Sequence, residues 1–141
     1  MKKYIGTKQI EAEPMTMGEA YRRGVLHAGR VPSESEKSKD GYYVRYENGY
    51  ESWSPADVFE KAYKVADTFL DRLRIERDEL HGRYVKAKNY LSSPLAEKQL
   101  TPREKGSLAA QVEFMRQYLL CVEERIKYAI EKLNDKKDLL E

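Results

Sequence analysis

Three polar side chains recur at every seventh residue late in the chain: Gln111, Tyr118 and Arg125. A spacing of seven keeps residues on one face of a helix. Such a row can bind a nucleotide, because an amide hydrogen-bonds a base edge and a guanidinium pairs with phosphate oxygens. The same row is equally typical of polar residues in a protein–protein interface.

Other residues offer the same chemistry. Lys88, Asn89 and Tyr90 combine a cation, an amide and a ring, and Arg116 lies between Gln111 and Tyr118. Upstream, residues 42–53 hold four tyrosines and Trp53. These rings could form a stacking wall for a flat heterocycle, although aromatic residues are also common on ordinary sheet surfaces.

The sequence shows no catalytic constellation. His27 and His81 have no metal-ligand spacing with Cys121, and the glycines form no phosphate-binding loop. Cys121 has no disulfide partner in the chain and is expected to be a small buried side chain in a cytosolic protein. We therefore expect no enzymatic activity, no metal and no cofactor.

Charge is balanced along the chain. Of 141 residues, 26 are Lys or Arg and 24 are Asp or Glu. Residues 1–66 carry 11 basic and 10 acidic side chains, and residues 67–141 carry 15 and 14. This balance disfavours DNA or RNA binding but leaves room for a small anionic ligand. The sequence has no apolar run that suits a membrane span and no secretory signal.

Residues 65–141 are predicted to form a long antiparallel helical hairpin. In its second arm, an apolar row that we call the inner seam follows steps of four and three: Leu108, Val112, Met115, Leu119, Val122, Ile126, Ala129 and Leu133. The first arm has the same rhythm from Leu70 to Leu91. Prolines at 94 and 102 predict a break between the arms, with Thr101 capping the second.

A second row runs beside the inner seam, and we call it the outer stripe: Phe114, Tyr118, Cys121, Arg125 and Tyr128. Two helices packed as a hairpin bury one row each. The outer stripe therefore predicts another neighbour, which is the N-terminal part of the chain, a second copy of the chain, or both. The alternative is a monomer in which this helix has a wide core face.

Residues 1–64 are predicted to form a small β-rich module. We expect an extended segment to residue 15, a short helix capped by Thr16 and Glu19, and a mobile loop over 33–39. A hairpin should span residues 41–53 with a two-residue turn at Asn48-Gly49.

A further helix should begin at Ser54-Pro55 and end near residue 63, with Val58, Phe59 and Ala62 facing inward. The expected fold class is α+β: a small antiparallel sheet with short helices, followed by the hairpin, which would mediate oligomerisation and ligand binding.

Several motifs resemble a known family. The segments MKKYIGTKQI (1–10), PMTMGEAY (14–21) and GYESWSPADVFEKAY (49–63) are similar to a leader module of small bacteriophage proteins. LRIERDEL (73–80) and the residues from Gln111 to Arg125 resemble the hairpin of phage anti-defence sponges. Leader and hairpin together resemble the first-described family of Thoeris anti-defence proteins, whose hairpin is shared with the anti-CBASS sponges.

This resemblance implies a function without chemical turnover. Proteins of that family bind the cyclic ADP-ribose signal of TIR enzymes in the cytoplasm of the infected bacterium, and some also bind cyclic trinucleotides at a separate site. For this chain the resemblance implies a cyclic ADP-ribose isomer as the ligand, with cyclic di- or trinucleotides as further candidates. They assemble through their hairpins, as dimers or hexamers, and hold ligand between subunits. The candidate ligand-binding residues are Trp53, Lys88, Tyr90, Gln111, Arg116, Tyr118 and Arg125.

Three other functions compete with this one. A coiled-coil hairpin could block a host protein directly, with no small ligand. An enzyme that hydrolyses the signal would need a general base or a metal site. A DNA-binding regulator would need a concentration of basic charge.

Overall fold

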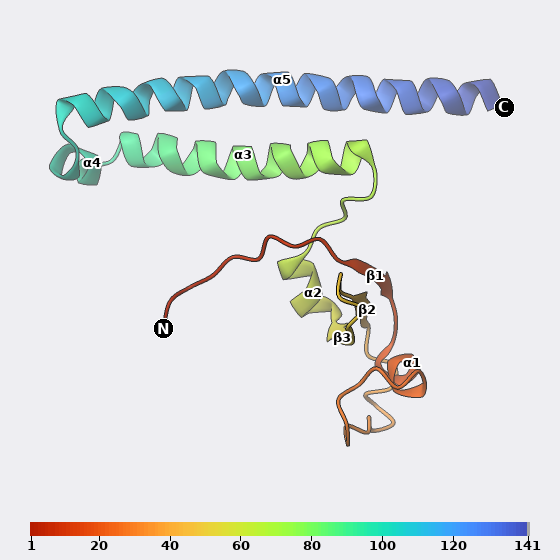
Figure 1. Cartoon of the computed structure of the whole chain (residues 1–141). Coiled ribbons are helices and arrows are strands. Elements are labelled where there is room, and N and C mark those ends of the chain that lie inside the picture. The colour runs from red at the N-terminus through yellow and green to blue at the C-terminus, as the bar shows by residue number, and fades with distance from the viewer. Residues whose placement is uncertain (141) are drawn as a thin grey trace. The chain divides into compact units, whose positions relative to one another are not determined.

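The computed structural model describes residues 1–140 and divides the chain into two compact units, Met1–Lys64 and Val65–Glu141. The first unit holds all three strands and two short helices, and the second holds three helices (Figure 1). The predicted α+β fold class is confirmed.

A three-stranded antiparallel sheet forms the centre of the first unit. Its strands are β1 (Glu11–Pro14), β2 (Gly41–Arg45) and β3 (Glu51–Pro55), with β2 in the middle. Ala12 pairs with Val44, and Val44 pairs with Ser52. The apolar side chain of Val44, at the middle of β2, is fully buried, whereas Arg45 beside it is exposed.

The turn between β2 and β3 differs from the prediction. Gly49 has a positive φ of 85°, but Asn48 does not, so the two-residue turn that needs both residues in that region is wrong. The Tyr46 N–H bonds to the Tyr50 carbonyl, which encloses a three-residue loop. The Asn48 side chain instead accepts the Tyr50 N–H at 3.0 Å, and this bond holds Asn48 in its ordinary conformation.

The core of this unit is small and depends on close packing. It contains Met15, Met17, Ala20 and Val44. The Trp53 ring lies against Gly41, where a Cβ atom would come within 2.3 Å of it, and the indole N–H donates to the Met15 carbonyl at 2.7 Å.

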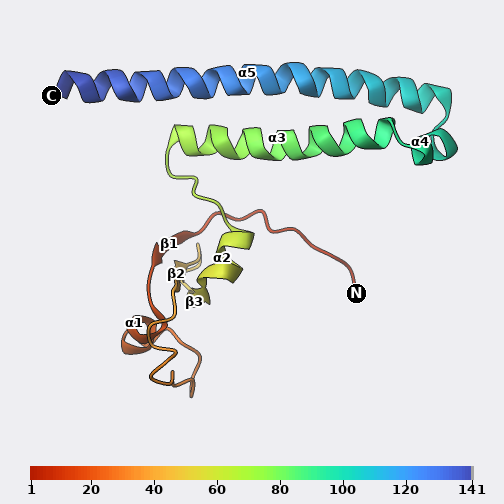
Figure 2. The same cartoon turned by 180° about the vertical axis from the view of Figure 1, so that it is seen from behind.

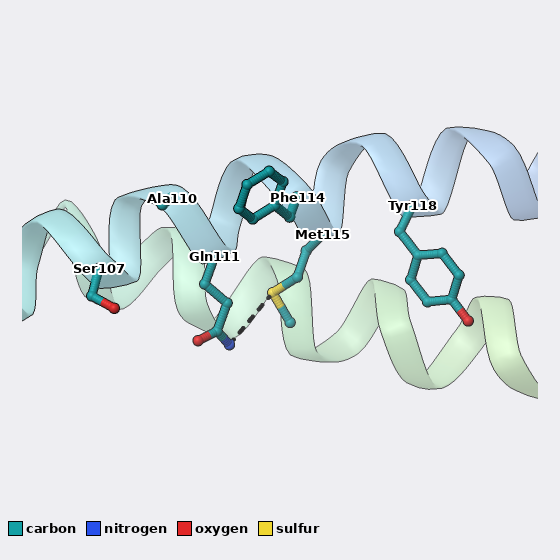
Figure 3. A pocket seen from close by; sticks show the side chains of 6 residues that line it. All are labelled: Ser107, Ala110, Gln111, Phe114, Met115 and Tyr118. Atoms are coloured by element: carbon teal, nitrogen blue, oxygen red, sulfur yellow. Dashed lines mark hydrogen bonds between the residues drawn. The ribbon is translucent and has the colours of Figure 1, made fainter.

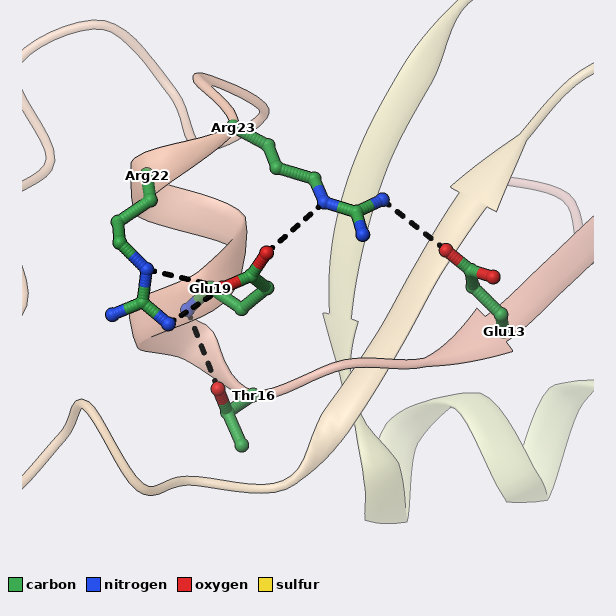
Figure 4. Close-up of polar contacts among 5 residues, drawn as sticks. All are labelled: Glu13, Thr16, Glu19, Arg22 and Arg23. Atoms are coloured by element: carbon green, nitrogen blue, oxygen red, sulfur yellow. Dashed lines mark hydrogen bonds and ion pairs between the residues drawn. The ribbon is translucent and has the colours of Figure 1, made fainter.

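Helix α1 (Met17–Arg22) begins as predicted, with Thr16 accepting the Glu19 N–H at 3.3 Å. The Glu19 carboxylate does not complete a capping box. It pairs with Arg22 and Arg23, and Arg23 also reaches Glu13 on β1 (Figure 4). These bonds hold the pKa of Glu19 below its usual value.

Residues 33–39, which we expected to be mobile, form a hydrogen-bonded turn. Glu36 accepts the Ser33 N–H and pairs with Arg30, which lowers the pKa of Glu36 to about 2. The turn also joins α1, because the Gly18 N–H donates to the Lys37 carbonyl at 3.0 Å.

Helix α2 (Ala56–Ala62) begins two residues after Ser54, and its cap position is Pro55, which supplies no side-chain bond. The prediction that Val58, Phe59 and Ala62 face inward is largely wrong, since Val58 and Ala62 are exposed. Only Phe59 is half-buried, and it stacks on Tyr42 with ring centroids 4.2 Å apart.

In the second unit, α3 (Phe69–Leu91) and α5 (Pro102–Leu140) run antiparallel, and the short α4 (Pro94–Gln99) lies at their turn, as both views show (Figures 1 and 2). Thr68 and Asp71 form a complete capping box at the start of α3. Thr101 and Glu104 hydrogen-bond to each other's backbone N–H groups at the start of α5, where the prolines predicted it. Helix α4 within the break was not predicted.

The inner seam packs against α3 along most of its length. Leu73, Val122 and Ile126 form the buried cluster, with Leu70 and Ala129 packed against it. Leu133, the last seam residue, is 53% exposed. Helix α3 begins at Phe69, so the first arm does not extend as far as this end of α5.

Candidate functional site

Within residues 65–140, the described part of the second unit, the rings of the outer stripe of α5 lie open to solvent. Phe114 is 72% exposed, and Tyr118 and Tyr128 are each about half exposed. Cys121, expected to be buried, is exposed, because α3 covers the adjacent seam and not the position of Cys121. Large exposed apolar patches are typical of interaction or ligand sites.

A shallow groove lies at the end of this stripe that is nearest to the turn between α3 and α5. It has a volume of about 510 Å³, and all of its lining residues come from α5: Ser107, Ala110, Gln111, Phe114, Met115 and Tyr118 (Figure 3). These side chains are apolar, aromatic or neutral and polar, and none carries a charge. The groove therefore suits a flat, uncharged group better than a phosphate.

The Gln111 amide is available within this groove. One of its N–H groups points to the Met115 sulfur at 4.0 Å, and thioether sulfur is a weak acceptor (Figure 3). This is the one hydrogen bond of the Gln111 side chain within residues 1–140.

Arg125 lies two turns beyond Tyr118 on the outer stripe. Seven residues correspond to about 10 Å along a helix, so a ligand of nucleotide size can reach from the groove to Arg125. The Arg125 guanidinium lies 5.7 Å from the Phe69 ring of α3. This cation–π contact holds the guanidinium at the flank of the hairpin, and within residues 1–140 its N–H donors make no hydrogen bond.

Arg116 belongs to the opposite flank of α5. It follows Gln111 by five residues, which is about 140° around a helix. Its guanidinium binds Glu113 through two hydrogen bonds of 3.1 and 2.7 Å. These bonds lower the pKa of Glu113 to about 2 and raise that of Arg116, to which the nearby Tyr84 phenol also contributes.

Lys88 and Tyr90 lie near the tip of the hairpin on α3. The Lys88 ammonium is 5.8 Å from the centre of the Tyr84 ring, which places it on the flank of Arg116. The Tyr90 hydroxyl donates to Gln99 of α4 at 2.7 Å, so Tyr90 braces the tip. The structure thus groups Gln111 and Tyr118 in one groove and places Arg116 with Lys88 elsewhere.

Trp53 lies in the first unit, where its ring and its N–H are both used in packing, as described above. A second cavity in that unit, of about 370 Å³, is lined in part by Asp40, Tyr42 and Glu60. The Tyr42 hydroxyl donates to Glu60 at 2.9 Å, which raises the pKa of Tyr42. Because two carboxylates and no cation line this cavity, it does not suit a phosphate.

Sequence reasoning missed two rings at the site, Phe114 in the groove and Phe69 against Arg125. Phe114 lies in the predicted outer stripe and could have been added from its position between Gln111 and Tyr118. Phe69 lies 56 positions before Arg125, and its proximity depends on the pairing of α3 with α5.

The comparisons with known proteins concern the hairpin. Residues 67–128 match the model of a protein family described as Sequestin. This segment contains α3, α4 and most of α5, including the groove. The name of the family is consistent with a sequestering protein. No curated protein and no solved structure matched the chain.

Two kinds of feature are absent from residues 1–140. No helix there is both long enough and apolar enough to cross a bilayer. No cluster of three or more His, Cys, Asp or Glu side chains is arranged there to hold a metal ion.

Proposed function

We propose that this protein is a bacteriophage anti-defence protein that binds a TIR-derived cyclic ADP-ribose signal, of the glycocyclic type, and holds it without degrading it. The observation that carries the proposal is the uncovered groove on α5, with Arg125 about 10 Å from Tyr118, inside the segment that matches the Sequestin family. The resemblance of the leader and hairpin motifs to the Thoeris anti-defence family supports the choice of signal.

The side chains at the groove favour binding over chemistry. An amide, two rings and a thioether can stack on a base and hydrogen-bond to it, but none of them is a general base near neutral pH. Arg125 supplies positive charge for a diphosphate without providing a nucleophile. A ligand held in this way leaves with its covalent bonds intact.

A second copy of the chain would complete the site. The groove is lined by α5 alone, so the hairpin of one chain covers only one side of a ligand. We propose that outer stripes from two chains pack together in the host cytoplasm, as a dimer or within a hexamer, and enclose the ligand between them. Enclosure removes water from the charge-assisted bonds to phosphate and slows escape of the ligand.

Titration calorimetry with a panel of ligands tests this proposal. The panel contains cyclic ADP-ribose isomers together with cyclic di- and trinucleotides. To compete with a defence effector, the protein should bind one class with a dissociation constant in about the nanomolar range, near −12 kcal/mol. If every ligand in the panel fails to bind at micromolar concentration, the proposal is wrong.

The exposed outer stripe also fits one alternative, a hairpin that binds a host protein directly. That function predicts no nucleotide binding and a host protein that is captured by the wild-type chain. It also predicts that Phe114→Glu abolishes this capture, because Phe114 is the most exposed ring of the stripe.

A further inference from the structure

The groove on α5 and the Arg125 guanidinium offer two different kinds of recognition. Its lining carries no charge, whereas Arg125 lies about 10 Å beyond Tyr118. If the proposed function holds, the phosphates belong near Arg125 and the base belongs in the groove. The exposed ring of Phe114 offers a stacking surface there, since aromatic side chains stack on any base.

Stacking does not distinguish one base from another, but the Gln111 amide can. Its carbonyl accepts and its N–H groups donate in one plane, and the weak bond to the Met115 sulfur is easily replaced. On one edge, adenine presents an amino donor at position 6 beside the N7 acceptor, which a glutamine amide matches with two bonds. Guanine and hypoxanthine present two acceptors on that edge, so they match it with one bond at most.

We propose that Gln111 is the residue that selects an adenine-type base, by binding its 6-amino group and N7 while the base stacks on Phe114. This proposal deepens the function proposed above and rests on it. It assigns different tasks to two of the three polar residues spaced by seven: Gln111 selects the base, and Arg125 binds the phosphates. It predicts that the protein distinguishes two ligands that differ only at position 6 of the base.

The test uses glycocyclic ADP-ribose and its hypoxanthine analogue, in which a carbonyl replaces the 6-amino group. Calorimetry should show that the wild-type protein binds the analogue about 5- to 100-fold more weakly, the range expected for one bidentate base contact. In Gln111→Met, which keeps the length and apolar stem of the side chain, the two ligands should bind equally well.

A matched control uses the same substitution on the other flank of α5. Gln117 hydrogen-bonds to Glu113 at 3.1 Å and does not line the groove. Gln117→Met should therefore keep the full preference for the adenine ligand. Circular dichroism of both variants checks that the helices are retained.

The outcomes separate this inference from the proposed function. If the wild-type protein binds both ligands tightly and equally, or if Gln111→Met keeps the preference, Gln111 does not select the base, although the protein still sequesters the signal. If neither ligand binds, the proposed function is wrong and the inference falls with it.

Discussion

Two adjacent rows on α5 have almost the same apolar spacing and opposite surroundings. The inner seam is covered by α3, with Leu119 at 7% exposure and Val122 fully buried. The outer stripe begins with Phe114 at 72% exposure, and within residues 65–140 its rings are about half exposed or more. Apolar spacing therefore identifies the rows that can be buried, while the number of neighbouring helices decides which row becomes core.

The largest expected effect comes from two adjacent leucines that lie on different sides of α5. Leu119→Ala leaves a cavity in the seam and should lower the free energy of unfolding by about 2–5 kcal/mol. Leu120 is 52% exposed, so Leu120→Ala should change it by about 0.5 kcal/mol or less. Both substitutions have the same helix propensity, so urea denaturation isolates the effect of burial. Equal losses would mean that α3 does not cover the seam as described.

Substitutions in the outer stripe should change self-association of the chain rather than its folding stability. Phe114→Glu places a charge in place of the most exposed ring of the proposed contact between chains and should weaken self-association at least about 30-fold, because buried aromatic anchors dominate interfaces. Sedimentation equilibrium measures this change, with Leu120→Glu as a control of equal charge outside the stripe. Unchanged association in Phe114→Glu would exclude the stripe as the contact.

The two arginines should differ in their effect on binding. Arg125→Ala should weaken ligand binding about 10- to 100-fold without unfolding the protein, because it removes charge-assisted bonds to phosphate. We also expect Arg116→Ala to weaken binding, but less, since the Arg116 guanidinium lies on the opposite flank of α5 and is already bound to Glu113. Calorimetry on both variants tests this order, and a larger effect at Arg116 would place the phosphates on the opposite flank.

The smallest effect concerns the Glu113–Arg116 pair. Because the pKa of Glu113 is lowered from 4.5 to about 2 in the folded chain, this pair stabilises the fold fully above pH 4.5. The contribution is lost as the pH falls from 4.5 to about 2. An NMR titration of the Glu113 carboxyl should give a midpoint well below 4.5, and Arg116→Ala should shift it upward. A wild-type midpoint at 4.5 would show that the pair does not form in solution.

Local patterns predicted much of this structure. The caps at Thr16 and Thr101 lie where the sequence predicted them, and the inner seam follows from apolar periodicity. The capping box of Thr68 and Asp71 was not predicted, although its residues also stand three apart. Features that depend on competing contacts were missed. The Asn48 side chain accepts a hydrogen bond from the Tyr50 N–H, and Asn48 does not adopt the positive φ that the predicted turn needs. Residues 33–39 form a turn that is bonded to Arg30 and to α1.

The candidate site was predicted only in part, for the same reason. The heptad spacing grouped Gln111, Tyr118 and Arg125 correctly on one face, because all three lie on one helix. The same spacing could have excluded Arg116, which follows Gln111 by five residues and so lies about 140° around the helix. Spacing could not find Phe69, which approaches Arg125 from α3. Trp53 was a candidate because of its aromatic ring, but in the structure this ring packs against Gly41.

The central claim is sequestration, and recovery of the ligand tests it most directly. The purified protein is mixed with glycocyclic ADP-ribose in substoichiometric amount, free ligand is removed by filtration, and the protein is then heated to release what it holds. The account predicts that mass spectrometry finds the ligand depleted from the filtrate and recovered from the protein with its mass unchanged. Recovery of a product with a different mass would contradict it, as would a filtrate from which no ligand has been removed.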